Sequence, residues 1–379
     1  RYSENQKIIS DTIKEFSKRE IIPNMYDWDE DQYFPLDLFK KIGELGMMGV
    51  LVPEKYGGSG LTYDEYVTII SDISQVCGSI GLSVAAHNSL CTGHILQYGN
   101  EQQKKKWLPK LASAQWIGAW GLTEHNTGSD AAAMKTTAVR DGDDWIINGS
   151  KIYISGSPWG DWGIVFARTD PDSRRGITAF IVENDWPGLT VEPVPVMRAY
   201  YPGQLFFDDL RVPSENVLGE VDGGWDLLAN KLLARARIPY SASNLGVAVA
   251  AHNMAVEYSK TRETFGAPLA SRQAIQWMLV DSEIEIRACR WLVWEAAWQF
   301  DNGDDFRQAA SVAKIHSAET LGNVVDRAIQ VHGGMGVTEW LPLERGYREA
   351  RIRKIGEGPT EVQKMVIARE LLNPGGVHA

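Results

Sequence analysis

The chain has 379 residues, which is too long for one simple core, so we expect two or three domains. Apolar residues make up 44% and charged residues 23%, as in ordinary globular proteins, and the net charge is −11 without a long Lys/Arg run. This balance argues against a nucleic-acid-binding protein, and the lack of any stretch of ~18 uninterrupted apolar residues argues against a membrane span.

Helical periodicity dominates the first third of the chain. Apolar residues recur at helical spacing around residues 9–16, 38–45 and 67–73. A glycine-rich loop at residues 53–60 precedes the last of these stretches. We therefore expect an N-terminal part made of helices.

The pattern changes near Trp120 to short segments rich in β-branched and aromatic residues. Two of them flank an Asp-Gly turn at residues 141–144, which predicts a hairpin. Further short strands are expected at residues 163–168, 177–183, 190–196 and 204–207. Short strands with regular turns predict a small barrel or sandwich.

From Trp225 onward the pattern is helical again and the segments are long, which predicts a bundle of three or four helices. The order of helices, strands and helices differs from the alternating βαβ pattern of a Rossmann fold. No GxGxxG segment opens a helix, so a dinucleotide would have to be bound in another way.

The three cysteines, Cys77, Cys91 and Cys289, lie far apart and form no CxxC pair. We therefore expect a reducing compartment, without a disulfide framework or a structural zinc site. His87 and His94 could share a helix face, but no acidic partner is evident, so we predict no bound metal.

Three segments could carry chemistry, and each also has an ordinary structural explanation. Residues 120–130 could bind a phosphate or a heteroaromatic edge, or form a polar turn between domains. In residues 355–361, Glu357 stands between two glycines, where a substrate could approach it closely, or where it is only a loop residue. Residues 262–273 could bind a pyrophosphate, or form a common glycine-capped helix end.

Together, in this order and with this spacing, the segments closely resemble the acyl-CoA dehydrogenase family over essentially the whole chain. The matching motifs are residues 51–58 (LVPEKYGG), 122–130 (LTEHNTGSD), 148–151 (NGSK), 207–213 (FDDLRVP), 262–266 (RETFG), 330–336 (QVHGGMG) and 357–358 (EG).

The resemblance implies a mixed α and β fold with a helical N-terminal domain (residues 1–118), a central β-barrel (residues 119–224) and a C-terminal four-helix bundle (residues 225–379). It also implies FAD, bound between the middle and C-terminal domains with help from a neighbouring subunit, and hence a homotetramer. We expect an acyl-CoA substrate and an electron-transfer flavoprotein as electron acceptor. We expect a cytoplasmic location in a bacterium, or the mitochondrial matrix in a eukaryote.

Matching positions imply the residues that contact the cofactor. Those near the flavin ring and the pyrophosphate are Trp120, Leu122, Thr123, Ser129, Tyr153 and Ser155. Those that bind the FAD of a partner subunit or its adenine half are Arg262, Thr264, Phe265, Gln273, Gln330, Gly333 and Gly334. Thr360 and Glu361 follow the base in the turn that contacts the cofactor, and Ser129, Arg237 and Gly358 match substrate-binding positions.

Glu357 matches the catalytic base. Some relatives place the base on the helix around Arg237, but the corresponding residue here is Ala236. The resemblance implies that Glu357 removes the α-proton of the thioester while a hydride leaves the β-carbon for flavin N5, giving a trans-2-enoyl-CoA. In the family, a ribityl hydroxyl and the backbone N–H of the base hold the thioester carbonyl.

Several points stay open. His125 is a small departure from the family pattern, and Pro359 removes one N–H donor and a hydroxyl near the flavin. Residues 193–204 also differ from the pattern, which leaves details of the CoA site open. Gly356 beside the base could admit a branched, cyclic or aromatic acyl group, or the opposite helix could refill the space; short to medium acyl chains are our first expectation. A flavin oxidase and a non-catalytic helical scaffold on the same fold are the alternatives.

Overall fold

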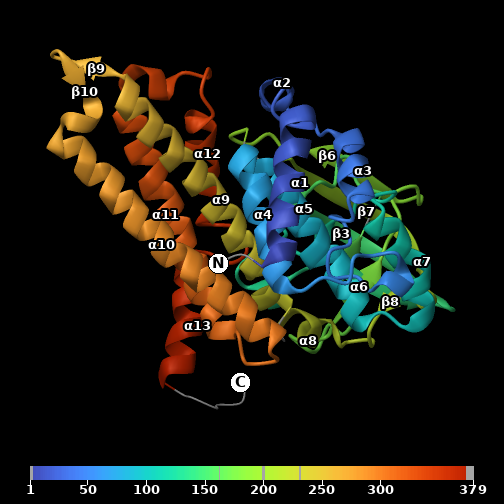
Figure 1. The fold of residues 1–379 in the computed structure, drawn as a ribbon. Coiled ribbons are helices and arrows are strands. Elements are labelled where there is room, and N and C mark those ends of the chain that lie inside the picture. Colours follow the sequence, from blue (N-terminus) through green and yellow to red (C-terminus); the bar gives the residue numbers. More distant parts are fainter. Residues whose placement is uncertain (1–2, 162, 199–200, 230–231, 373–379) are drawn as a thin grey trace. The chain divides into compact units, whose positions relative to one another are not determined.

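The protein is represented by a computed structural model that describes residues 3–161, 163–198, 201–229 and 232–372. The chain divides into two compact units (Figure 1). The first, here called the helical unit, contains Arg1–Met25, Tyr63–Leu82 and Arg237–Ala379. The second, here called the sheet unit, contains Tyr26–Thr62 and Ser83–Ala236.

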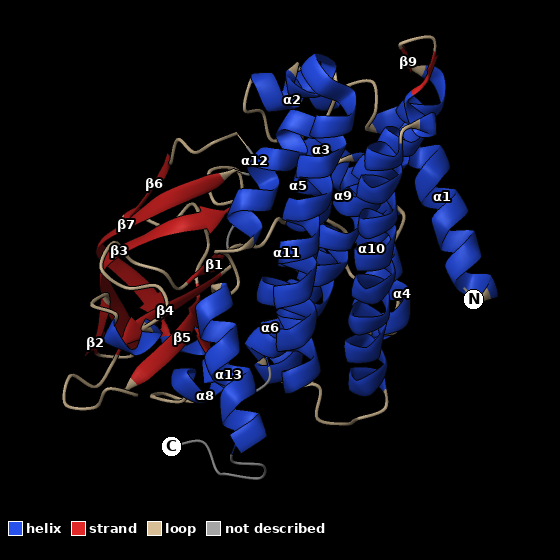
Figure 2. Cartoon of the chain, turned by 90° about the vertical axis from the view of Figure 1, so that its left-hand side faces the viewer, coloured by secondary structure: helices blue, strands red, loops and turns tan. Residues whose placement is uncertain are grey.

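The helical unit is built from long helices that pack side by side. In it α4 packs against α1 and α10, and α11 packs against α10, α12 and α13 (Figure 2). A short hairpin of β9 (Glu263–Thr264) and β10 (Ala267–Pro268) follows α9 and precedes α10. The helices are α1 (Glu4–Glu20), α4 (Tyr63–Val76), most of α9 (Leu232–Thr261), α10 (Gln273–Asp301), α11 (Arg307–His332), α12 (Leu343–Arg353) and α13 (Thr360–Leu372).

Local sequence explains where these helices begin and which faces they bury. A capping box opens α1, because the Ser3 hydroxyl accepts the Gln6 N–H and the Gln6 side chain accepts the Ser3 N–H. In α11, small and apolar residues recur every three or four positions and are buried, which lets the neighbouring helices approach closely. The buried residues of this stripe include Ala310, Ala313, Ser317, Leu321, Val324 and Ala328.

The sheet unit holds one eight-stranded sheet with the order β6-β7-β3-β2-β4-β5-β8, and β1 pairs parallel with β4. The strands are β1 (Trp120–Gly121), β2 (Thr137–Asp141), β3 (Asp144–Ser155), β4 (Ile164–Arg168), β5 (Ile177–Ile181), β6 (Leu189–Pro193), β7 (Pro202–Pro213) and β8 (Val217–Leu218). The helices of this unit are α2 (Met25–Glu30), α3 (Leu36–Glu44), α6 (Gly93–Tyr98), α7 (Glu101–Ala112) and α8 (Gly224–Ala229), and α5 (Gly78–Ala86) belongs to both units.

Successive side chains along a strand point to opposite faces of the sheet, so this unit has two separate apolar clusters. In β4, Ile164 and Phe166 join a cluster that includes Trp107 and Leu111 of α7. Val165, between them, joins a second cluster with side chains of β3, β5 and β7. The sheet is therefore buried on both faces around β4, which fixes the position of β1, its parallel neighbour.

The order of helices, sheet and helices agrees with the sequence prediction. The hairpin predicted around the Asp-Gly turn is confirmed as β2 and β3, with Gly142 at a φ of 62°. The strand predicted at residues 204–207 is longer, because β7 continues past Phe207 and pairs with β3 again from Leu210. Asp208 and Asp209 lie opposite the register shift between Ile147 and Gly149, and Asp209 has a φ of 49°, so the two residues form a local irregularity within β7. No helix in the described ranges is long and apolar enough to cross a membrane.

Candidate active site

Glu357 lies in a tight turn between α12 and α13. Its φ is 58°, in the left-handed region that side-chain-bearing residues seldom adopt, and Gly358 follows with a φ of 91°. Arg237 Nε donates to the Glu357 carbonyl oxygen at 3.1 Å, and Gln363 Nε2 donates to the same oxygen at 3.4 Å. A Cβ at position 358 would lie 2.3 Å from Gln363 Nε2, so this position requires glycine. A strained residue held in place by its neighbours is typical of functional sites.

The Glu357 carboxylate is poorly solvated. Its Oε2 atom is buried and accepts no hydrogen bond from the described part of the chain. Burial raises the pKa of Glu357 from 4.5 to about 7, and the positive charges of Arg237 and Lys314 oppose this shift. Burial also lowers the pKa of Arg237, opposed by the charge of Glu357. A carboxylate with a pKa near neutral is suited to accept a proton at physiological pH.

The backbone N–H of Glu357 is also available. No acceptor for this N–H is found among the described residues. The N–H groups of Ile355 and Gly356, by contrast, both donate to the carbonyl of Ile352. The base and an unused N–H donor therefore belong to the same residue. This is the pairing that a thioester needs when a proton leaves next to its carbonyl.

Two side chains that sequence reasoning missed lie around this turn. The Tyr240 hydroxyl of α9 donates to the Arg353 carbonyl at 3.3 Å and would lie 2.8 Å from a Cβ at Gly356. The space that Gly356 leaves is thus filled from the opposite helix, the second of the two outcomes considered above.

Lys314 of α11 is the other missed residue. It is fully buried, and its Nζ donates to the Lys354 carbonyl at 3.3 Å. Burial lowers the pKa of Lys314 to about 8, while the charge of Glu357 opposes this effect. A lysine inside the buried stripe of α11 was the signal available in the sequence, because such a position needs a specific partner.

In the sheet unit, the candidate flavin residues lie in β1, in the loop that follows it and near the end of β3. Trp120 begins β1, and its Nε1 is buried without a hydrogen-bond partner among the described residues. The Leu122 side chain is buried, and the Thr123 carbonyl accepts the Ile152 N–H at 2.8 Å. This hydrogen bond connects the segment after β1 to β3, the strand that carries Tyr153 and Ser155.

Tyr153 is turned outward by an irregularity in β3. The register between β3 and β7 shifts between Lys151 and Ile154, and Tyr153 adopts a φ of 61°. Its side chain is 54% exposed. Ser155, half-buried, is paired again with Pro202 of β7, and Ser129 is exposed in the loop that follows residue 123.

The residues predicted to bind a partner subunit's FAD lie apart from Glu357 in the chain and at the surface of the helical unit. Arg262 directly follows α9, and the hairpin after it presents Phe265, with a φ of 50° and a fully exposed ring. The Arg272 guanidinium stands 5.9 Å from that ring and donates to the Thr264 carbonyl. Gln273 is exposed at the first residue of α10.

A second group of predicted residues lies in the last turn of α11 and directly after it. Gln330, Gly333 and Gly334 are exposed, and a Cβ at either glycine would meet no atom within 4 Å. Close to the base, Thr360 begins α13 with its Oγ1 buried and without a hydrogen-bond partner in the described ranges, and Glu361 is exposed.

The unusual stretch at residues 193–204 is only partly described. Tyr200 lies outside the described residues. Tyr201 packs edge-on against Phe34 at 5.5 Å and Trp159 at 5.7 Å between ring centroids. In the described ranges, no group of three or more His, Cys, Asp or Glu side chains could hold a metal ion.

Comparison with known proteins gives the family. Sequence models of the acyl-CoA dehydrogenase N-terminal, middle and C-terminal domains match residues 3–115, 119–210 and 222–372. A short-chain specific acyl-CoA dehydrogenase of Clostridium acetobutylicum is 39% identical over 370 residues, which cover 97% of each chain.

Solved structures agree over nearly the full length. Butyryl-CoA dehydrogenase of Megasphaera elsdenii matches with a TM-score of 0.95 and 36% identity, covering 98% of this chain and 99% of that one. A chain from the structure described as the electron transferring flavoprotein of Acidaminococcus fermentans matches with a TM-score of 0.96 and 37% identity, with the same coverage. A glutaryl-CoA dehydrogenase from Mycobacterium smegmatis, solved in complex with FADH2, matches with a TM-score of 0.93 and 28% identity, covering 100% of this chain and 97% of that one.

The fold class inferred from sequence is thereby confirmed. The chain belongs to the acyl-CoA dehydrogenase family of oxidoreductases.

Proposed function

We propose that this acyl-CoA dehydrogenase desaturates a short to medium acyl-CoA to the trans-2-enoyl-CoA, with Glu357 as the base that removes the α-proton. The observation that carries the proposal is the Glu357 turn. A strained backbone presents a carboxylate whose Oε2 is buried without a partner among the described residues and whose pKa burial raises to about 7.

The neighbours of Glu357 have distinct roles in this proposal. The α-proton of a thioester is only weakly acidic, so negative charge on the thioester oxygen must be stabilised as the proton leaves. The Glu357 N–H, which the described chain leaves free, donates to that oxygen. Arg237 fixes the turn through the Glu357 carbonyl, and its positive charge favours the ionised carboxylate. Substrate binding expels water and strengthens each of these interactions.

FAD is the cofactor, and the residues present fit it. Trp120 Nε1 and Thr360 Oγ1 are buried polar atoms without protein partners in the described ranges, and Gly333 and Gly334 leave open space at the surface. When bound, FAD supplies the hydride acceptor at N5. In the sheet unit we assign Trp120, Leu122, Thr123, Ser129, Tyr153 and Ser155 to it; in the helical unit we assign Arg262, Thr264, Phe265, Gln273, Gln330, Gly333, Gly334, Thr360 and Glu361. Ser129, Arg237 and Gly358 are assigned to the substrate.

The acyl group is expected to be short to medium in length. The butyryl-CoA dehydrogenase match and the short-chain specific relative support this choice. Tyr240 supports it as well, because its hydroxyl fills the space beside Gly356 that a wider acyl group would need. We place the enzyme in fatty acid β-oxidation, either in a bacterial cytoplasm or in a mitochondrial matrix.

The remaining partners follow from the family and from the surface. The match to the Acidaminococcus fermentans flavoprotein structure supports an electron-transfer flavoprotein as electron acceptor. A homotetramer is supported by large apolar side chains exposed along one face of α10: Trp277, Val280, Ile284, Trp291 and Trp298.

The test is Glu357→Gln, which keeps the shape and the backbone N–H but cannot accept a proton. FAD content and acyl-CoA binding should survive, while anaerobic flavin bleaching by butyryl-CoA should slow by more than the ~10²–10⁴-fold typical of general-base loss. Glu370→Gln on α13 is the matched control and should bleach at the parent rate. Near-parental bleaching in Glu357→Gln would place the base elsewhere. Rapid recolouring of the parent in air would favour an oxidase.

A further inference from the structure

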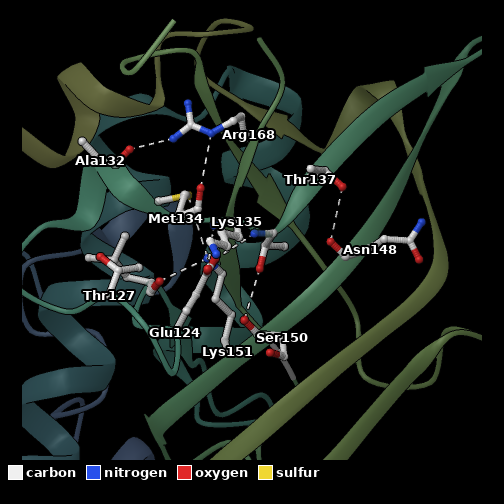
Figure 3. A network of polar contacts seen from close by, with 12 residues as sticks. Glu124, Thr127, Ala132, Met134, Lys135, Thr137, Asn148, Ser150, Lys151 and Arg168 are labelled. Carbon is white, nitrogen blue, oxygen red and sulfur yellow. Dashed lines mark hydrogen bonds and ion pairs between the residues drawn. The ribbon is translucent and has the colours of Figure 1, made fainter. Parts of the chain in front are cut away.

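Lys151 and Glu124 form an ion pair in the interior of the sheet unit (Figure 3). Lys151 Nζ lies 2.8 Å from Glu124 Oε1, and the two side chains are 0% and 4% exposed. Burial lowers the pKa of Lys151 to about 8, an effect that the charge of Glu124 opposes. The proposed function gives neither residue a role in proton removal or in substrate binding, and an apolar sheet core has no need of two buried charges.

Each member of the pair makes further hydrogen bonds, and apart from a 3.9 Å contact of Lys151 Nζ with Met134 Sδ these go to backbone groups of neighbouring segments. Glu124 accepts the Lys135 N–H at 2.7 Å and the Thr136 N–H at 3.0 Å, just before β2. Lys151 also donates to the Leu122 carbonyl at 3.1 Å. The pair thus joins three segments: the loop after β1, the approach to β2, and β3 (Figure 3).

Two of these segments carry residues assigned to the flavin. The Leu122 carbonyl is held by Lys151, and the next carbonyl, that of Thr123, is held by the Ile152 N–H. Ile152 is free to bond outside the sheet because the β3–β7 register shifts there, and the same shift turns Tyr153 outward. The register shift directly after Lys151 therefore determines two features of the expected flavin site: the position of the Thr123 carbonyl and the outward direction of the Tyr153 side chain.

Stability alone is a weak reason for such a pair. Two charges lose their hydration on burial, and replacing a buried ion pair by apolar residues of similar volume is often neutral or stabilising. We propose that Glu124 and Lys151 are positioning residues, which hold the backbone of residues 122–123 and the outward turn of Tyr153 in the arrangement that receives the flavin. The inference rests on the proposed FAD-dependent function.

The double variant Glu124→Met/Lys151→Met separates positioning from stability, because it removes both charges and keeps most of the volume. Its apoprotein should still fold and unfold cooperatively, at a somewhat lower temperature than the parent apoprotein, because the Lys135 and Thr136 N–H groups lose their acceptor. Its dissociation constant for FAD should rise at least tenfold, and the visible circular dichroism of bound FAD should change, since that signal reports how the ring is seated. Arg174→Met is the matched control: it removes an exposed ion pair with Asp130 in the same loop and should leave both readouts unchanged.

A single variant, Lys151→Arg, tests the same proposal if the double variant does not fold. Lys151→Arg keeps the positive charge but replaces the compact ammonium that donates to the Leu122 carbonyl by a larger, planar guanidinium. This variant should fold, bind FAD more weakly and have a shifted flavin midpoint potential. If either folded variant binds FAD within twofold of the parent with an unchanged spectrum, the pair does not position the flavin. A parent chain that binds no FAD would instead overturn the proposed function.

Discussion

Glu357 must be ionised before it can accept a proton, and its surroundings set the pH at which this happens. Burial raises its pKa from 4.5 to about 7. The fraction of competent base therefore falls as pH falls through about 7. We expect the rate of anaerobic flavin reduction at subsaturating acyl-CoA to rise with pH, to reach half of its limiting value near pH 7 and to level off about one unit higher, since this regime reports the free enzyme.

The same shift predicts the pH dependence of stability. A raised carboxyl pKa means that the folded state holds the proton more tightly than the unfolded chain, so the contribution of Glu357 to stability falls as pH rises from about 4.5 to about 7. Activity and stability should therefore move in opposite directions across this window. A rate profile that is flat between pH 5.5 and 8.5 would show that the base titrates elsewhere.

Lys314 supplies the second prediction at this scale. Its ammonium is buried under the Lys354–Glu357 turn and interacts with the charges of Glu357, Arg237, Glu361 and Glu319. Lys314→Met removes a positive charge that favours ionised Glu357, so the acid limb of flavin reduction should move to higher pH by about one unit, the low end of the range for an opposite charge close by.

Two variants make the Lys314 result interpretable. Lys314→Arg keeps the charge and should leave the acid limb in place, and Lys364→Met removes an exposed lysine of α13 and should do the same. If Lys314→Met retains FAD and its acid limb does not move, Lys314 stabilises the turn without tuning the base.

The site residues divide by what the sequence could reveal about them. Glu357 could be proposed as the base from sequence because its Glu-Gly motif matches a family pattern. Tyr240 and Lys314 were missed because their roles depend on contacts with residues about forty or more positions away, at Arg353 and Lys354. Periodicity places such residues on a buried helix face but does not identify the turn that they contact.

At the scale of elements, the exposed face of α10 is the feature that most needs explanation. Four of its large apolar residues, Trp277, Ile284, Trp291 and Trp298, repeat every seven positions, the spacing of a helix face that packs against another helix. The opposite stripe, through Ile286 and Val293, is buried within the subunit. The second apolar face could not be assigned, because one chain does not show what covers it.

Ile284→Glu tests whether another subunit covers that face. Ile284 is 60% exposed, so the change should leave the subunit folded and raise the dissociation constant of the oligomer at least about tenfold, or ~1.4 kcal/mol. Ile8→Glu is the matched control, since Ile8 is 64% exposed on α1 of the same unit. Sedimentation should show smaller species for the first variant alone. Equal sedimentation of both variants would remove this face from the interface.

At the scale of the whole molecule, the contacts within the structure divide the chain into two compact units, whereas the family resemblance implies three domains. α1 and α4 precede the sheet in sequence, yet they group with the long helices that follow it. Sequence pattern gave the order and type of the elements, because period and turn residues are local. It could not group α1 with distant helices, because that depends on which apolar faces meet in the fold. The domains 1–118, 119–224 and 225–379 remain our proposal.

Cofactor binding and assembly should be coupled through the hairpin after α9. In the structure Arg262 is exposed beside a fully exposed Phe265, a costly arrangement for an isolated subunit and a suitable one for contact with a partner's FAD. Arg262→Ala should therefore lose FAD and shift the tetramer toward smaller species together. The measurements are the FAD-to-protein absorbance ratio and light scattering on the same sample.

Lys260→Ala is the control for this last experiment. Lys260 is exposed two residues earlier and pairs only at the surface with Glu257, so its loss should change neither readout. Adding excess FAD to Arg262→Ala should restore part of the tetramer, because a ligand shared between subunits favours the state that binds it. A monomeric Arg262→Ala chain with full FAD content would show that each subunit binds its cofactor alone, and the assignment of residues 262–273 to a partner's flavin would then be wrong.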